Sequence, residues 1–254
     1  MQRKEILRYH KGIKQNIMDS IANEHIIKLF LNEIEILSFA TFPLSMDELV
    51  IGFLFSEGII SSLDDIISYK YHKKVKEYHI NVDKEIISLN LPTLTSGCAK
   101  GKTFTKLEDI DPTKDRFINF AIFAKSDELT ELMKEFQNKS TLFNETGAVH
   151  MAALASTTRI KYYYEDLGRH NAIDKVLGKA LLDKTLLEDK LLFTTGRISS
   201  EIISKIIIAG LPIVVSRSSP TSYAIDLGSK FGVTVIGFCR GNRFNVYSHS
   251  SRII

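Results

Sequence analysis

The chain has 254 residues, of which 44% are hydrophobic, so it is long enough to bury a sizeable core. Its formal net charge is +3, but this charge is unevenly distributed. Residues 191–254 contain seven basic and two acidic residues, a local charge of +5, which leaves −2 for residues 1–190. A basic segment of this kind is typical of an anion-binding surface, although a solvated basic face would give the same count.

Several classes of protein are disfavoured. No stretch approaches the roughly 18 apolar residues that cross a bilayer. The N-terminal sequence MQRKEILRYHKG lacks the apolar core of a signal peptide. Two cysteines cannot build a disulfide framework. We therefore expect a cytoplasmic protein that binds neither a membrane nor nucleic acid, with a symmetric homodimer as the default oligomer.

The first hundred residues predict a small α+β region. Residues 25–39 (HIIKLFLNEIEILSF) predict a hairpin with Asn32 and Glu33 at its turn. Ser45-Met-Asp-Glu48 predicts a capping box at a helix start, and Gly58 is placed to end that helix. Residues 69–82 and 85–91 predict further strands.

Strands and helices alternate after about residue 116. Helices are predicted over 127–138, with Ser126 as the cap, and over 171–183, 199–210 and 220–232; strands are predicted over 159–165, 190–195, 211–216 and 233–239. This order favours a largely parallel, three-layer α/β sheet. The predicted fold class is thus α/β, with a smaller α+β N-terminal domain. A polar boundary between residues 105 and 116 divides the chain into domains 1–110 and 111–254.

The segment TSGCAKGKT (95–103) allows two interpretations. Its last three residues resemble the end of a phosphate-binding loop, but Ser96 stands where that loop requires glycine, and no helical pattern follows. A reactive thiol fits better. Cys98 has small neighbours, and Lys100 and Lys102 lie close in sequence, where their charges favour the thiolate. The alternative is an incidental exposed cysteine.

Five segments lie where α/β proteins bind ligands, at the ends of predicted strands. They are residues 146–150, 165–171, 194–201, 216–221 and 238–243. Three of them combine Gly or Ser with Arg directly before a helix, whose free N–H groups and positive dipole end attract anions. Ser219-Pro220 can equally be a plain helix start. Together, the segments predict a site for a large anion.

His150, His170 and Cys239 allow structural as well as chemical roles. A zinc deaminase requires His-x-Glu and a later Pro-Cys-x-x-Cys. Met-Ala follows His150, and the chain contains no Cys-x-x-Cys, so we expect no catalytic metal. Cys239 ends a predicted strand, a place more typical of packing than of chemistry.

These segments resemble the formate dehydrogenase accessory sulfurtransferases of the FdhD family. The resemblance runs from the predicted hairpin and residues 47–58 almost to the C-terminus. Its most specific parts are residues 165–175, 195–201, 219–221 and 237–243. It implies a cytidine-deaminase-like α/β domain joined to a smaller N-terminal domain.

The resemblance also implies a function. Members of the family accept sulfur from a cysteine desulfurase as a cysteine persulfide. They pass it to the molybdenum or tungsten bis-guanine-dinucleotide cofactor that formate dehydrogenase requires. Cys98 matches the cysteine that carries the persulfide. The expected cofactor-binding residues are Phe238, Cys239, Arg240, Gly241, Asn242 and Arg243, together with Thr195, Gly196, Arg197, Ser218, Ser219, Gly168, Arg169, His170 and Asn171.

One departure from the family pattern leaves alternatives open. Many members have Cys-x-x-Cys in this loop, whereas no second cysteine follows Cys98 here. A single nucleophilic thiolate is enough for persulfide transfer, so we expect a sulfurtransferase. A cofactor-binding chaperone for formate dehydrogenase, without chemistry of its own, is the alternative. A third possibility, a nucleotide-modifying hydrolase, lacks the metal ligands that the reaction would need.

Overall fold

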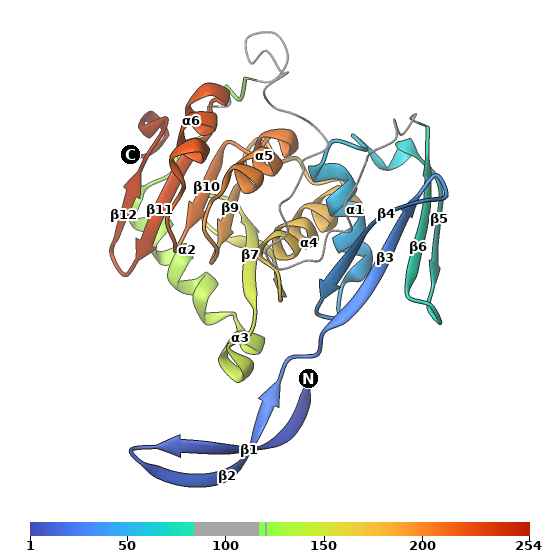
Figure 1. Cartoon of the computed structure of the whole chain (residues 1–254). Coiled ribbons are helices and arrows are strands. Elements are labelled where there is room, and N and C mark those ends of the chain that lie inside the picture. The colour runs from blue at the N-terminus through green and yellow to red at the C-terminus, as the bar shows by residue number, and fades with distance from the viewer. Residues whose placement is uncertain (84–116, 120) are drawn as a thin grey trace.

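The computed structural model describes residues 1–83, 117–119 and 121–254. The predicted strand at 85–91, the Cys98 segment and the expected domain boundary lie outside these residues. The described part forms a mixed α/β fold with three sheets and six α-helices (Figure 1), and two short 3-10 helices at Leu63–Asp65 and Ser250–Arg252. None of its helices has the length and apolar character needed to cross a membrane.

The largest sheet has the strand order β12-β11-β10-β9-β7-β8. Its strands are β7 (His150–Ala155), β8 (Ile160–Asp166), β9 (Leu191–Thr194), β10 (Ile213–Ser216), β11 (Thr234–Arg240) and β12 (Arg243–Val246). Only β9, β10 and β11 pair in parallel. The expectation of a largely parallel sheet is wrong at both flanks, because β7 and β12 run antiparallel to their neighbours. The connections between β7 and β8 and between β11 and β12 are too short for the crossover that a parallel pair requires. These strands therefore form antiparallel hairpins.

Helices cover both faces of this sheet. One face carries α4 (Arg169–Leu182), α5 (Ser200–Ala209) and α6 (Ser222–Phe231), and the other carries α2 (Ser126–Asn138). The interior strand β7 is buried on both sides: Leu154 packs toward the first group of helices and Met151 toward α2. The four predicted helices are confirmed.

Two local predictions in this region need correction. Ser126 is the first residue of α2 and not its cap, since Lys125 occupies the cap position. Residues 146–150 were expected at a strand exit, but they lead from the short helix α3 (Thr141–Thr146) into β7.

The second sheet has the order β4-β3-β6-β5 and packs against α1 (Met46–Ser56). Its strands are β3 (His25–Leu31), β4 (Ile34–Thr41), β5 (Ile66–His72) and β6 (Glu77–Val82). The predicted hairpin turn is confirmed, with positive φ values of 46° at Asn32 and 65° at Glu33. Gly58, with φ 71°, follows the end of α1 as expected. The predicted capping box is wrong: Ser45 adopts φ 54°, and its side chain makes no capping bond.

Helix α1 lies between the small sheet and α4, and two glycines let the helices meet backbone to backbone. A Cβ atom on Gly52 would stand 1.7 Å from the carbonyl oxygen of Asp174, and one on Gly178 would stand 1.9 Å from that of Glu48. No side chain fits at either position. The α1–α4 contact therefore joins the six-stranded sheet and the four-stranded sheet into one packed unit (Figure 1).

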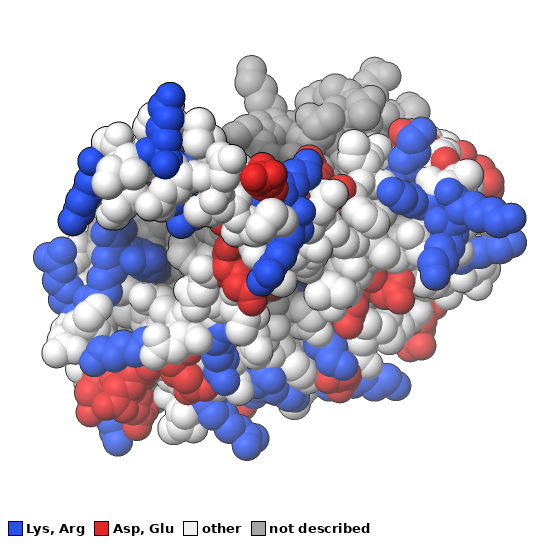
Figure 2. Space-filling view, turned by 90° about the horizontal axis from the view of Figure 1, so that it is seen from below, with Lys and Arg blue, Asp and Glu red and all other residues white. Residues whose placement is uncertain are grey.

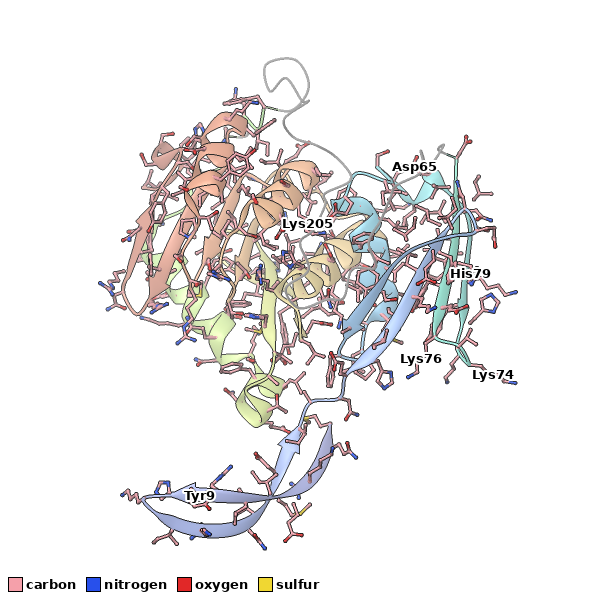
Figure 3. All side chains as sticks on the ribbon, viewed as in Figure 1. Tyr9, Asp65, Lys74, Lys76, His79 and Lys205 are labelled. Atoms are coloured by element: carbon pink, nitrogen blue, oxygen red, sulfur yellow. The ribbon has the colours of Figure 1, made fainter. Side chains whose placement is uncertain are left out.

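A separate hairpin precedes this unit. Strands β1 (Gln2–His10) and β2 (Ile13–Ile21) pair only with each other and project from the body (Figure 1). Tyr9, labelled in Figure 3, is 62% exposed on this hairpin. The sequence patterns do not predict this hairpin.

Candidate anion-binding edge of the large sheet

The predicted ligand segments meet at one end of the large sheet. Strands β8, β9, β10 and β11 end there, and β7 and β12 begin there because they run antiparallel. We call this end, formed by residues 165–171, 194–201, 216–221 and 238–243, the carboxyl edge. Figure 2 views the molecule from below, and Lys and Arg side chains gather at more than one side of this face. Within the edge itself, the segments contribute Arg169, Arg197, Arg217, Arg240 and Arg243. The edge thus combines positive charge with helix starts.

His150, Arg169 and His170 lie near one another at the edge. The Nδ1 atom of His150 is 3.4 Å from the hydroxyl oxygen of Thr195, which follows β9. Burial lowers the pKa of His150, and the charges of Arg169 and His170 lower it further. The start of β7 therefore supplies a half-buried imidazole beside an arginine, although residues 146–150 do not form a strand exit.

Arg169 is the first residue of α4 and has an unsatisfied polar atom. Its Nε atom is buried and has no hydrogen-bond partner among the residues that the structure describes. Gly196 leaves room for it, since a Cβ atom there would stand 2.9 Å from the Cβ of Arg169. The first N–H groups of a helix also lack partners within that helix. An anion placed here would meet both kinds of donor.

A His–Glu pair joins the starts of α4 and α5. The Nε2 atom of His170 is 3.2 Å from Oε2 of Glu201, but not in the geometry of a hydrogen bond, so the contact is an ion pair when the imidazole is protonated. His170 lowers the pKa of the Glu201 carboxyl. Glu201 was not among the predicted site residues. Its position in segment 194–201 was the available signal.

Backbone contacts hold the exits of β10 and β11 together. The amide of Phe238 donates to the carbonyl of Ser218 over 2.9 Å. The Nε atom of Arg240 donates to the carbonyl of Arg217 over 2.8 Å, and its guanidinium lies 5.7 Å from the ring centroid of Phe238. The side chains of Arg197, Arg217, Arg240 and Arg243 are exposed. The structure therefore gathers these predicted residues on one accessible surface.

Two predicted cofactor-binding residues point elsewhere. The side chain of Cys239 is fully buried in the core beside α2, and burial raises its pKa to about 11. Asn171 is 4% exposed, and its amide nitrogen donates to the carbonyl of Ala40 and to Asp166. Neither side chain lines the edge.

The described part of the chain contains no candidate metal site. Within it, no group of three or more His, Cys, Asp or Glu side chains is placed to share a metal ion. The donors at the carboxyl edge are guanidinium, imidazole, hydroxyl and backbone N–H groups, which suit an anionic ligand.

Comparison with known proteins points to one family. The model of the FdhD/NarQ family matches residues 22–254. The sulfur carrier protein FdhD of Listeria innocua is 36% identical, over 100% of this chain and 98% of its own. That of Bacillus subtilis is 34% identical, over 98% and 96%. A crystal structure from Desulfotalea psychrophila, assigned as a formate dehydrogenase accessory protein, matches with a TM-score of 0.82 and 26% identity, covering 100% of this chain and 99% of that one. The chain belongs to the FdhD/NarQ family.

Proposed function

We propose that this protein is a sulfur carrier for formate dehydrogenase and acts as a sulfurtransferase. Cys98 accepts sulfur from a cysteine desulfurase, and the carboxyl edge holds the molybdenum or tungsten bis-guanine-dinucleotide cofactor that receives it. The names of the relatives that align over the whole chain support the sulfur-carrier role. The cofactor role rests on Arg169, whose buried Nε atom has no partner among the described residues and stands within an arginine-rich edge.

The first transfer exchanges one sulfur–sulfur bond for another. The Cys98 thiolate attacks the terminal sulfur of the desulfurase persulfide, and the donor cysteine leaves as a thiolate. Lys100 and Lys102 lie close in sequence and favour the thiolate of Cys98. No second cysteine is needed, because the acceptor thiolate is the only nucleophile in this step.

The second transfer uses the cofactor as the substrate. The sulfur–sulfur bond of the Cys98 persulfide breaks, and Cys98 keeps the electron pair as a thiolate. The transferred sulfur would need two electrons to become sulfide, and the metal of the bound cofactor, in a reduced state, would be their source. After this step Cys98 is ready for another sulfur.

The carboxyl edge supplies charge for the two pyrophosphate groups of such a cofactor. Arg197, Arg217, Arg240 and Arg243 are exposed beside the helix starts. Guanidinium groups bind phosphate through paired, charge-assisted hydrogen bonds. Because the bound ligand favours only the folded state, it also stabilises the protein by mass action.

A cofactor-binding chaperone is the second candidate, because Cys98 has no neighbouring cysteine in the sequence. The two candidates differ in a Cys98→Ser variant tested for maturation of formate dehydrogenase. Sulfur transfer predicts no active dehydrogenase with this variant and normal activity with the Cys239→Ala control. Full activity with Cys98→Ser would refute sulfur transfer and leave the chaperone.

A further inference from the structure

Asp166, at the end of β8, is a fully buried carboxylate with donors on both oxygens. Its Oδ1 atom accepts from the amide of Gly168 at 3.1 Å and from the side chain of Asn171 at 2.8 Å. Its Oδ2 atom accepts from the hydroxyl of Thr41 and from the amide of Phe42. One side chain thus joins the start of α4 to the end of β4, which belongs to the other sheet.

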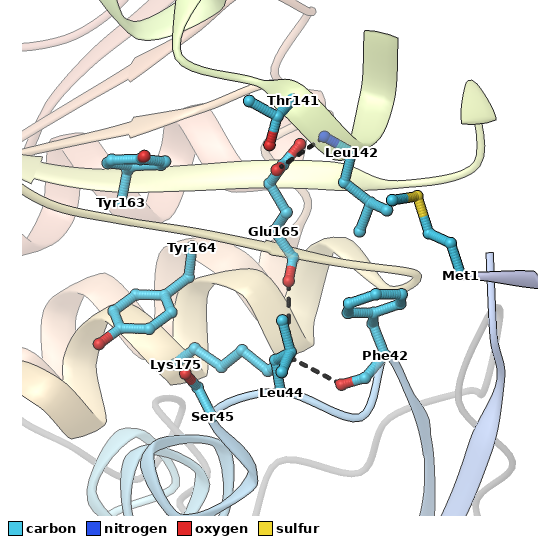
Figure 4. A pocket seen from close by; sticks show the side chains of 10 residues that line it. All are labelled: Met1, Phe42, Leu44, Ser45, Thr141, Leu142, Tyr163, Tyr164, Glu165 and Lys175. Atoms are coloured by element: carbon cyan, nitrogen blue, oxygen red, sulfur yellow. Dashed lines mark hydrogen bonds between the residues drawn. The ribbon is translucent and has the colours of Figure 1, made fainter. Parts of the chain in front are cut away.

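Lys175 completes this cluster and is only 1% exposed. Its Nζ atom forms an ion pair with Asp166. It also donates to the carbonyls of Phe42, at 3.2 Å, and Glu165, at 3.5 Å (Figure 4). Burial lowers the pKa of Lys175, while Asp166 opposes that shift. All three hydrogens of the ammonium group therefore have an acceptor.

Asp166 accepts hydrogen bonds from both ends of the turn that contains Arg169 and His170. Gly168 precedes Arg169, and Asn171 follows His170 within the first turn of α4. Asn171 also donates to the carbonyl of Ala40 over 3.0 Å, so β4 contacts this turn directly as well as through Asp166. A shift of Asp166 would move the turn, and Arg169 would move with it.

We propose that Asp166 and Lys175 are positioning residues of the carboxyl edge and that Thr41 of β4 completes their set. The cluster fixes the turn at residues 168–170 so that Arg169 meets the phosphates of the cofactor. This inference rests on the proposed function. A buried ion pair often contributes little net stability compared with apolar side chains of the same size, and we therefore assign this one a positioning role.

A second buried network, which also includes a residue of α4, provides a matched control. The hydroxyl of Ser56 donates to Asp174 over 2.7 Å and accepts from Lys205 over 2.8 Å, and Ser56 is as buried as Thr41. Asp174 lies farther along α4 than the turn at residues 168–170. Thr41→Val and Ser56→Ala therefore each remove one buried hydroxyl from an ionic network, and only the first network touches the edge.

The first readout is binding of GDP, used as a fragment of the cofactor, measured by isothermal titration calorimetry. We expect both variants to unfold at lower urea concentrations. Thr41→Val should weaken GDP binding about tenfold, because binding must then restore the position of Arg169, and Thr41→Ser should restore the affinity. The affinity of Ser56→Ala for GDP should stay within about twofold of the wild-type value. This is a smaller change than the loss of one hydrogen bond to the ligand would cause. Equal weakening by both variants, or no weakening by Thr41→Val, would overturn the proposal.

A second readout needs no ligand. Because Arg169 lowers the pKa of His150, a displaced Arg169 should let that pKa rise in Thr41→Val but not in Ser56→Ala. Titration of the His150 ring protons by NMR measures this. If the wild type binds no GDP, the cofactor-binding part of the proposed function fails, while the titration still decides the positioning role. An unchanged titration in Thr41→Val would reject that role.

Discussion

The ammonium nitrogen of Lys205 lies 2.9 Å from Asp174, inside the junction of α1, α4 and α5 (Figure 3). It also lies 2.7 Å from Glu57 at the end of α1. Burial alone would lower the pKa of Lys205, but the two carboxylates raise it and hold the group charged. This cation ties the small sheet, through α1, to the helices of the large sheet.

Replacement of this cation should be costly. Lys205→Met leaves two buried carboxylates without their counter-ion, and we expect a loss of about 3–5 kcal/mol in the free energy of unfolding, measured with urea. The control is Lys179→Met, which removes an exposed pair with Asp183 on α4 and should change stability little. A Lys205→Met variant as stable as the control would contradict the assigned role.

Arg169 should contribute to anion binding through its unpartnered nitrogen. We expect Arg169→Gln to weaken GDP binding about 10- to 100-fold, the loss of one charge-assisted hydrogen bond. Arg159→Gln is the control, because Arg159 is an exposed arginine in the turn between β7 and β8, at the opposite end of the sheet. At higher salt, the affinities of the two variants for GDP should become more similar, since screening weakens ionic contacts. Equal affinities for GDP at low salt would exclude Arg169 from the site.

His150 should make stability depend on pH. Its pKa is lowered in the folded protein, so near the ordinary value of about 6.5 the unfolded chain takes up a proton that the folded chain does not. The free energy of unfolding should therefore fall as the pH drops below about 7, and this contribution should level off once folded His150 is itself protonated. Urea unfolding between pH 5 and about 7.5 measures the slope. His150→Gln should make the free energy of unfolding less dependent on pH. An unchanged slope in this variant would contradict the lowered pKa of His150.

Sequence patterns captured the elements that carry strong local signals. Asn32 and the helix-ending Gly58 were recognisable, because left-handed backbone favours Asn and Gly; Glu33 shares this backbone without being a residue that favours it. The rule that strand exits hold ligands picked out the segments that the structure brings together at the carboxyl edge, and ligand binding there stays a prediction. The β1–β2 hairpin escaped prediction because its exposed strands lack the alternation of a half-buried sheet.

Tertiary contacts decided the remaining features. Cys239 stands in sequence between Phe238 and Arg240, yet the alternation of a strand turns its side chain into the core. Asp166 gains its role from Thr41, a residue 125 positions away, and no local pattern predicts such a contact. The antiparallel flanks depend on the direction in which each strand is paired, and the sequences of the strands alone do not give that direction.

The central claim is that Cys98 carries sulfur. Intact-protein mass spectrometry after incubation with a cysteine desulfurase and cysteine tests it most directly, on the wild type, Cys98→Ala and Cys239→Ala. We predict an adduct with the mass of one sulfur atom on the wild type and on Cys239→Ala, and none on Cys98→Ala. An adduct that persists in Cys98→Ala, or a wild type that gains no sulfur while it still binds GDP, would contradict the claim.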